Sequence, residues 1–218
     1  MISLCVLTGC GKKEEKQEEL KINNFTSSNI VADTFLLDDE KLMIHLTNTS
    51  STMIDLLDID VAFYNAEGEL LKTGDAFLKN ILSKKEGYTT IELPKDESGK
   101  IIPSTKIDVK VHENKYEESL TENYIDKIKV SYTKDKSDEN KLNLKIENTS
   151  GQVLNEVEII ALFKEKGEIK ASISTYLINL SKDSNTTIYV PSVLKNSESK
   201  YISYDEIEFH VNHAIKNK

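Results

Sequence analysis

Hydrophobic and polar residues alternate along short stretches of the chain, and polar turns separate these stretches. Every second residue is apolar in Leu42–Leu46, Ile59–Phe63 and Ile107–Val111. A period of two puts the apolar side chains on one face of a β-strand. No long window has the i, i+3, i+4, i+7 spacing of an amphipathic helix, and the best helix candidate is a short segment at 116–121. Short alternating runs bounded by turns predict an antiparallel β-sandwich.

The chain contains an internal repeat. The segment Lys41–Ser50 aligns with Lys141–Ser150, one hundred residues further on, and both end in Asn-Thr-Ser. Each copy continues with a β-like run and then a Gly-containing turn. The other ordered matches pair 59–63 with 159–163, 82–84 with 180–182, 89–94 with 186–191, and 107–111 with 207–211. Ordered matches at nearly one spacing indicate a tandem duplication.

Each copy has about the length of an immunoglobulin-type sandwich, roughly 100 residues. The motif residues of the second copy are Asn148–Gly151, Val157, Ile159, Phe163 and Gly167, and those of the first are Asn48, Leu57, Ile59, Val61, Phe63, Tyr64 and Gly68. With these residues the chain resembles the FxLYD-type immunoglobulin-like domains of bacterial surface proteins. The resemblance implies an extracytoplasmic module with a loosely defined binding role and no catalytic residues to transfer.

Both cysteines, Cys5 and Cys10, lie in the first ten residues. This excludes a disulfide framework or a thiolate metal site in the rest of the chain. The sequence Leu7–Cys10 resembles the bacterial lipobox, which implies that the Cys10 thiol carries a lipid and that residues 1–9 are a truncated signal peptide. The run before Cys10 is shorter than an ordinary signal and has no Lys. The alternative is a cytosolic chain in which Leu-Thr-Gly-Cys occurs by chance.

Together these patterns predict an all-β protein with two tandem immunoglobulin-like antiparallel β-sandwiches after a lipidated N-terminal tether. The predicted parts are a charged tether at 10–20, a first sandwich at 21–112, a hydrophilic linker at 113–122 and a second sandwich at 123–218. The resemblance to Gram-positive surface lipoproteins places the protein on the outer face of the cytoplasmic membrane.

Composition narrows the classes of partner. The chain has 28 Lys+Arg against 37 Asp+Glu, a net charge of −9, and all of its cations are Lys. Arg is the residue best suited to grip phosphate and read guanine, and an acidic chain repels nucleic acid. A nucleic-acid partner is therefore excluded.

Three short motifs are similar to catalytic motifs of a known enzyme class, but their order and setting do not fit that class. Lys72–Gly74, with the Ser-x-x-Lys sequences at Ser131–Lys134 and Ser197–Lys200, resembles the motifs of penicillin-binding proteins. In those enzymes the Ser-x-x-Lys comes first and opens a helix, whereas here the order is reversed and no helix is predicted. We therefore predict no catalytic residues, no cofactor and no enzyme activity.

Histidines and acidic runs are the candidate metal ligands. His210 and His213 are three residues apart, so on a regular strand they point to opposite sides and do not share an ion; His45 falls on the solvent-facing phase of its strand, and His112 is the fourth histidine. We therefore predict surface histidines and no metal. Calcium ligands are conceivable at Asp38–Glu40, Asp55, Asp58 and Asp60, but no EF-hand loop is present, and the second copy has Asn155 and Ile160 at two of these positions.

Two further patterns remain. Five Asn-x-Ser/Thr sequons begin at Asn24, Asn48, Asn148, Asn179 and Asn185, and for Asn48 and Asn148 we expect turn hydrogen bonds to local backbone. Ile160 and Leu162 are apolar at outward strand positions where the first copy has Asp60 and Ala62. This strip is a partner surface, the contact between the two sandwiches, or packing under a loop.

The function predicted from all this is a non-catalytic binding or spacer module, anchored to the membrane and acting through sheet faces or edges. Its partners would be the membrane, through the lipid, and another surface protein or cell-envelope component. The alternative is a ligand-capture or hydrolytic protein that uses a cleft between the two sandwiches.

Overall fold

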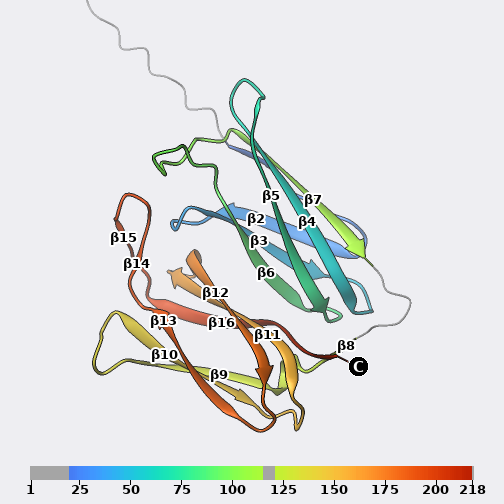
Figure 1. Ribbon diagram of the computed structural model, residues 1–218. Coiled ribbons are helices and arrows are strands. Elements are labelled where there is room, and N and C mark those ends of the chain that lie inside the picture. The colour runs from blue at the N-terminus through green and yellow to red at the C-terminus, as the bar shows by residue number, and fades with distance from the viewer. Residues whose placement is uncertain (1–19, 115–120, 218) are drawn as a thin grey trace, which may run out of the picture.

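The computed structural model describes residues 20–114 and 121–217, and these residues form an all-β protein of stacked antiparallel sheets. Figure 1 shows four main sheet layers, two from residues 21–114, the N-terminal half, and two from residues 121–217, the C-terminal half. The predicted fold class is therefore confirmed, and an immunoglobulin-like sandwich is compatible with it. The division into two separate domains stays a prediction.

The N-terminal half pairs a four-stranded sheet with a three-stranded sheet. The four-stranded sheet has the order β1 (Lys21–Asn23), β7 (Lys106–Asn114), β4 (Ile54–Tyr64) and β5 (Leu70–Ile81). The three-stranded sheet has the order β2 (Ile30–Leu36), β3 (Lys41–Asn48) and β6 (Glu86–Glu92). All pairs are antiparallel except β1 with β7.

The C-terminal half repeats this arrangement. Its four-stranded sheet has the order β12 (Glu168–Leu180), β11 (Leu154–Glu165), β16 (Glu206–Asn217) and β8 (Thr121–Asn123). Its three-stranded sheet has the order β13 (Asn185–Pro191), β10 (Lys141–Asn148) and β9 (Ile128–Lys134). A 3-10 turn, η1 (Ile125–Lys127), precedes β9, and a small hairpin of β14 (Leu194–Lys195) and β15 (Tyr201–Ile202) is added.

The predicted repeat coincides with this symmetry. The matching segments at 41–50 and 141–150 begin with β3 and β10, which are the middle strands of equivalent three-stranded sheets. The segments at 59–63 and 159–163 lie in β4 and β11, and those at 107–111 and 207–211 lie in β7 and β16. The predicted linker range differs in detail, because β7 extends to Asn114 and β8 starts at Thr121. The segment at 116–121, named above as the best helix candidate, lies mostly outside the described residues.

Alternation on the strands builds the core of each half. Ile59, Val61 and Phe63 of β4 are buried against Ile107 and the inner residues of the opposite sheet. In the second copy, Val157 and Ile159 lie in one cluster, and Ala161 and Phe163 in an adjoining one. Burying side chains of this kind contributes about 1.5–3 kcal/mol each.

Asn48 and Asn148 form the same buried corner in the two halves. The side-chain amide of Asn48 donates to the backbone oxygens of Thr52, Ile81 and Leu82 at 2.8, 2.9 and 3.2 Å, and its Oδ1 accepts from the backbone N–H and hydroxyl of Ser50. Asn148 makes the equivalent bonds to residues 150, 152, 180 and 181. The expected turn chemistry is confirmed, and it extends to a second strand, so each Asn ties two strand ends together.

Candidate functional site

The candidate site is the buried junction between the N-terminal and C-terminal halves. The outer face of the β2-β3-β6 sheet lies against the outer face of β11, β12 and β16 (Figure 1). A hydrophobic cluster fills this junction, and its buried members are Leu37, Met43, Tyr88, Ile160 and Leu162. Of the three explanations for the apolar strip at Ile160 and Leu162, the contact between the sandwiches is therefore the one that holds.

Backbone groups of the two halves are joined by side-chain hydrogen bonds. Asn212 of β16 accepts from the N–H of Tyr88 at 3.0 Å and donates to its C=O at 2.7 Å, so one amide side chain satisfies both backbone groups of a buried residue. The tip of the β2–β3 turn adds Asp39, which accepts from the N–H of Ser172 at 3.2 Å and pairs with Lys41 at 2.9 Å. Glu40 accepts from Ser197 in the β14–β15 hairpin.

The histidines of β16 correct one prediction. His210 and His213 both lie on the junction side of the sheet, and do not point to opposite sides as a regular strand requires. The reason is a β-bulge, because Ile159 is paired with Val211 whereas Glu158 is paired with His213, which leaves Asn212 as an extra residue. A bulge of this kind shifts the alternation by one. The shift is visible in the sequence. The residues that face the core have odd numbers from 207 to 211, whereas the next core residue, Ala214, has an even number.

His45 is also at the junction and not simply on a solvent-facing strand. Its ring stacks on Tyr88, with centroids 4.5 Å apart, and Tyr88 in turn meets the edge of His210 at 4.9 Å. Partial burial acts to raise the pKa of the nearby Glu86 carboxyl, but the Tyr88 hydrogen bond and the charge of His45 outweigh it and hold that pKa below its usual value. Burial lowers the pKa of His210.

The acidic candidates for calcium are separated in the fold. Asp39 and Glu40 are engaged at the junction as described, whereas Asp58 and Asp60 lie on the opposite, outer face of β4. There Asp58 accepts from Asn114, and Asp60 lies 3.2 Å from the exposed His112. In the two described stretches of chain, no group of three or more His, Cys, Asp or Glu side chains is arranged to hold a metal ion.

The motifs that resemble penicillin-binding proteins are dispersed too. Ser131–Lys134 lies in β9, Ser197–Lys200 in the turn between β14 and β15, and Lys72–Gly74 in β5. The glycine has a packing role, because a Cβ at Gly74 would lie 2.5 Å from Cγ2 of Ile91. Gly74 therefore allows β5 to approach β6 closely.

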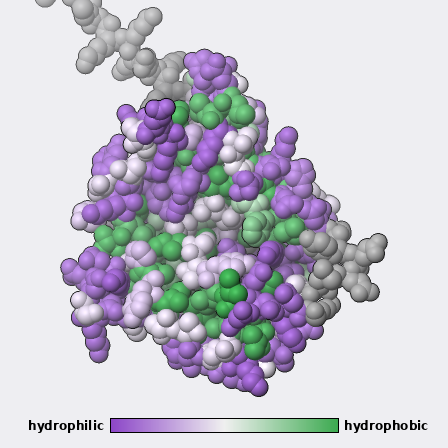
Figure 2. Space-filling model, viewed as in Figure 1, coloured by the Kyte–Doolittle hydropathy of each residue, from purple (hydrophilic) through white to green (hydrophobic). Residues whose placement is uncertain are grey.

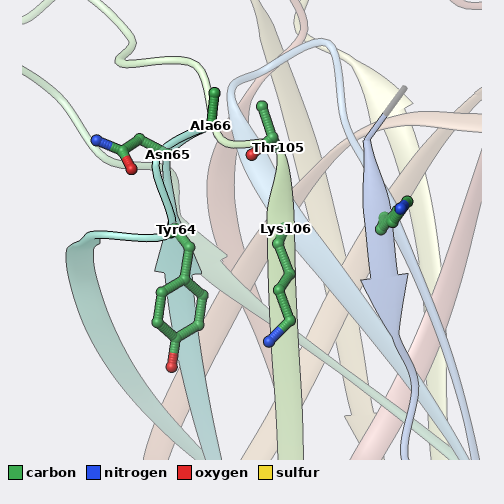
Figure 3. A pocket seen from close by; sticks show the side chains of 7 residues that line it. Tyr64, Asn65, Ala66, Thr105 and Lys106 are labelled. Atoms are coloured by element: carbon green, nitrogen blue, oxygen red, sulfur yellow. The ribbon is translucent and has the colours of Figure 1, made fainter. Parts of the chain in front are cut away.

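The hollows on the surface are shallow. Figure 3 shows one of about 510 Å³ at the outer end of the N-terminal half, lined by Tyr64, Asn65, Thr105 and Lys106 among others. The Lys106 ammonium lies 4.8 Å from the centroid of the Tyr64 ring and 2.7 Å from Oδ2 of Asp108, and its hydrogen bond to Asp108 raises its pKa. The charge of Lys106 is thus already paired, and the lining residues contain no nucleophile with an adjacent base.

Cys10, the predicted lipid attachment site, and Cys5 lie outside the described residues. Between residues 20 and 114 and between 121 and 217, no helix is long and apolar enough to cross a membrane. Comparison with known proteins finds no family model and no curated protein that matches the chain.

Sequence reasoning missed Asn212, whose amide joins Tyr88 to β16, and the burial of His213. Both follow from the bulge. The displaced apolar phase of β16 is the one sequence feature that would have indicated it.

Proposed function

We propose that this chain is a membrane-anchored, extracytoplasmic lipoprotein that acts as a non-catalytic binding or spacer module through its sheet faces. The observation that carries the proposal is the buried junction, where Met43, Ile160 and Leu162 are fully inaccessible to solvent. A filled junction stacks the four layers into one body and leaves two outer sheet faces that no other described sheet covers. A joined body of this kind suits a module that displays a surface.

The two free faces are mostly polar, with Phe77 of β5 exposed on the first and Tyr189 of β13 exposed on the second. The outer face of β7, β4 and β5 exposes Asp58, Asp60, Asp75 and Lys110. The outer face of β13, β10 and β9 exposes Thr187 and Tyr189 of β13, Lys145 of β10, and Ser131 and Thr133 of β9. In the view of Figure 2, hydrophobic residues form separate patches among hydrophilic ones. We infer that a partner would be bound by hydrogen bonds and charges on one of these faces.

The cleft-based alternative has little support. A ligand between the halves would have to displace the buried cluster around Tyr88 and Leu162 and break the two bonds of Asn212. We therefore favour binding on a face over capture or hydrolysis between the halves.

The anchor rests on the resemblance of Leu7–Cys10 to a lipobox. The chain enters the fold at β1, whose Lys21 begins the edge strand of the outermost sheet. A lipid on Cys10 would therefore attach through a charged tether to the outer layer of the N-terminal half. The C-terminal three-stranded sheet would then be the layer furthest along the stack from the anchor.

Replacing Cys10 by Ser is expected to abolish lipid labelling. The experiment is metabolic labelling of the full chain with an alkyne fatty acid in a Gram-positive bacterium, followed by detection on a gel and membrane fractionation. Cys5→Ser is the matched control, because Cys5 belongs to the predicted signal peptide and should leave labelling intact. Labelling that persists in Cys10→Ser, or that is absent from the unaltered chain, would contradict the anchor.

A further inference from the structure

His213 is a buried titratable group to which neither half gives a hydrogen bond. It lies in β16 and is fully inaccessible to solvent, and its two ring nitrogens have no hydrogen-bond partner. Oε2 of Glu158 is 3.5 Å from Nδ1, and Oε2 of Glu156 is 3.8 Å from Nε2. Buried polar atoms nearly always have a partner, so an imidazole left without one calls for an explanation.

The neighbours of His213 come from both halves of the molecule. On its own side, Glu156 and Glu158 of β11 flank the ring and Tyr176 of β12 meets it edge-on, with centroids 5.7 Å apart. From the N-terminal half, Lys79 of β5 reaches across the junction and pairs with Glu156 at 2.8 Å. Tyr176 donates its hydroxyl to the same carboxylate.

A shared metal ion does not account for this arrangement. The two carboxylates approach opposite nitrogens of the ring, so they cannot join one nitrogen of His213 around a single ion. The arrangement is instead one in which charge on the ring would be costly.

The charge states follow from burial and from Lys79. Burial, and then the positive charge of Lys79, lower the pKa of His213 to about 4. Burial raises the pKa of Glu158. Burial also acts to raise the pKa of Glu156, but the hydrogen bonds from Lys79 and Tyr176 outweigh it and hold that pKa below its usual value. At neutral pH the junction therefore holds a neutral imidazole beside a Lys79–Glu156 ion pair.

We propose that acidification charges His213 and loosens the contact between the two halves, so that the junction is a pH-sensitive device. When the halves separate at this point, water reaches the ring and can solvate an imidazolium. In the separated state the His213 imidazole then binds a proton at a pH where it stays neutral in the closed state. Protonation of Glu156 at lower pH acts in the same direction, because it removes the partner of Lys79.

Linkage gives the sign and the size of the effect. An accessible histidine has a pKa of 6.5, whereas the buried one has a pKa of about 4. Between these values the His213 site binds more protons in the separated state, so its contribution to the closed state is lost as the pH falls and regained as the pH rises. The raised pKa of Glu158 acts in the opposite direction, because the closed state protonates that carboxyl more readily, and the comparison with His213→Gln isolates the histidine contribution. The ratio of separated to closed molecules is expected to rise by up to about 300-fold across this window.

The test is native-state hydrogen exchange at the Tyr88 amide of the full chain, measured by NMR at several pH values between 7 and 4. This amide is bonded to Asn212 across the junction, so a parting of the halves breaks its hydrogen bond and exposes it to exchange. After correction for intrinsic exchange, its protection factor should fall steeply as the pH is lowered from 7 to 4. The fall in His213→Gln should be at least tenfold smaller than the fall in the unaltered chain. His112→Gln is the control, because His112 is exposed on the far face and should not alter the profile. Equal profiles for His213→Gln and the unaltered chain would overturn the proposal.

A second measurement covers the case in which His213→Gln does not fold. The titration of the His213 ring in the unaltered chain can be followed by its NMR shifts. The proposal requires the ring of the closed protein to stay neutral above pH 5, while the protection factor of the Tyr88 amide already falls as the pH is lowered from 6.5 towards 4. A ring midpoint at the ordinary histidine value, or a protection factor that does not change between pH 6.5 and 4, would overturn it.

Discussion

Replacing Asn48 by Asp is expected to lower the free energy of unfolding by about 4 kcal/mol at pH 7. Asn48 is 1% exposed, and its amide donates to three backbone oxygens, those of Thr52, Ile81 and Leu82. A carboxylate has the same shape but no donor, so it would face three carbonyl oxygens with a buried negative charge. Urea unfolding followed by circular dichroism measures the change.

The same variant carries its own internal check. Because the three carbonyl oxygens raise the pKa of an Asp at position 48, protonation restores one donor, and the loss should be smaller at pH 5 than at pH 7. Asn148→Asp should repeat the effect in the other half, where the bonds are equivalent. Asn24→Asp is the matched control at an exposed sequon, with an expected change within about 0.5 kcal/mol. A loss of that small size in Asn48→Asp would contradict the structural role of the corner.

The second large effect is expected at the junction. Ile160→Asp gives the second copy the aspartate that the first copy has at the equivalent position, Asp60. The substitution should destabilise the closed junction by about 4 kcal/mol. Ile160 is fully buried between the halves, so the new carboxylate would lose water and gain no partner. The neighbours Ile159 and Ala161 point into the core of the C-terminal half and are unchanged. We therefore expect the β-sheet signal to persist while the hydrodynamic radius grows.

The reciprocal change is the control for Ile160→Asp. Asp60→Ile places the apolar residue on the free outer face of β4, where Asp60 is exposed. It should leave the free energy of unfolding within about 0.5 kcal/mol and promote self-association in sedimentation experiments, because it adds exposed apolar surface. If Ile160→Asp were as mild as Asp60→Ile, the buried junction would be contradicted.

Much of the fold could be predicted because alternation and repetition are local properties of a sequence. The period of two around Ile59–Phe63 identified strand and inward face together, and its copy at Ile159–Phe163 identified the repeat. The turns were equally local, since Gly68 and Gly167 have φ values of +79° and +85°, which other residues rarely adopt. The sheet order that joins these strands is not local and came from the structure.

The junction was only partly predictable. Ile160 and Leu162 stood out as apolar residues at outward positions, but the same pattern fits a partner surface. Whether this strip is a partner surface or a contact between the halves depends on residues far away in the chain. Met43 and Tyr88, for example, pack near Ile160 and Leu162 only after both halves have folded.

The position of His213 was predicted wrongly because strand periodicity assumes a regular strand. The bulge opposite Glu158 and Ile159 turns His213 to the junction side, next to a lysine from the other half. A pairing irregularity of one residue is set by the partner strand, so alternation within β16 alone could only hint at it.

The buried cluster at the junction joins the two halves into one body, and this predicts a fixed distance between their outermost layers. The most direct measurement is the distance between spin labels at Glu67 and Asp183, in the exposed turns at 65–69 and 181–184 of the outermost layers. The labels are attached to cysteines in a full chain that also carries Cys5→Ser and Cys10→Ser, which removes the two natural thiols. Double electron–electron resonance at pH 7 is expected to give a single narrow distance distribution. A broad distribution, or two separate ones, would contradict the claim.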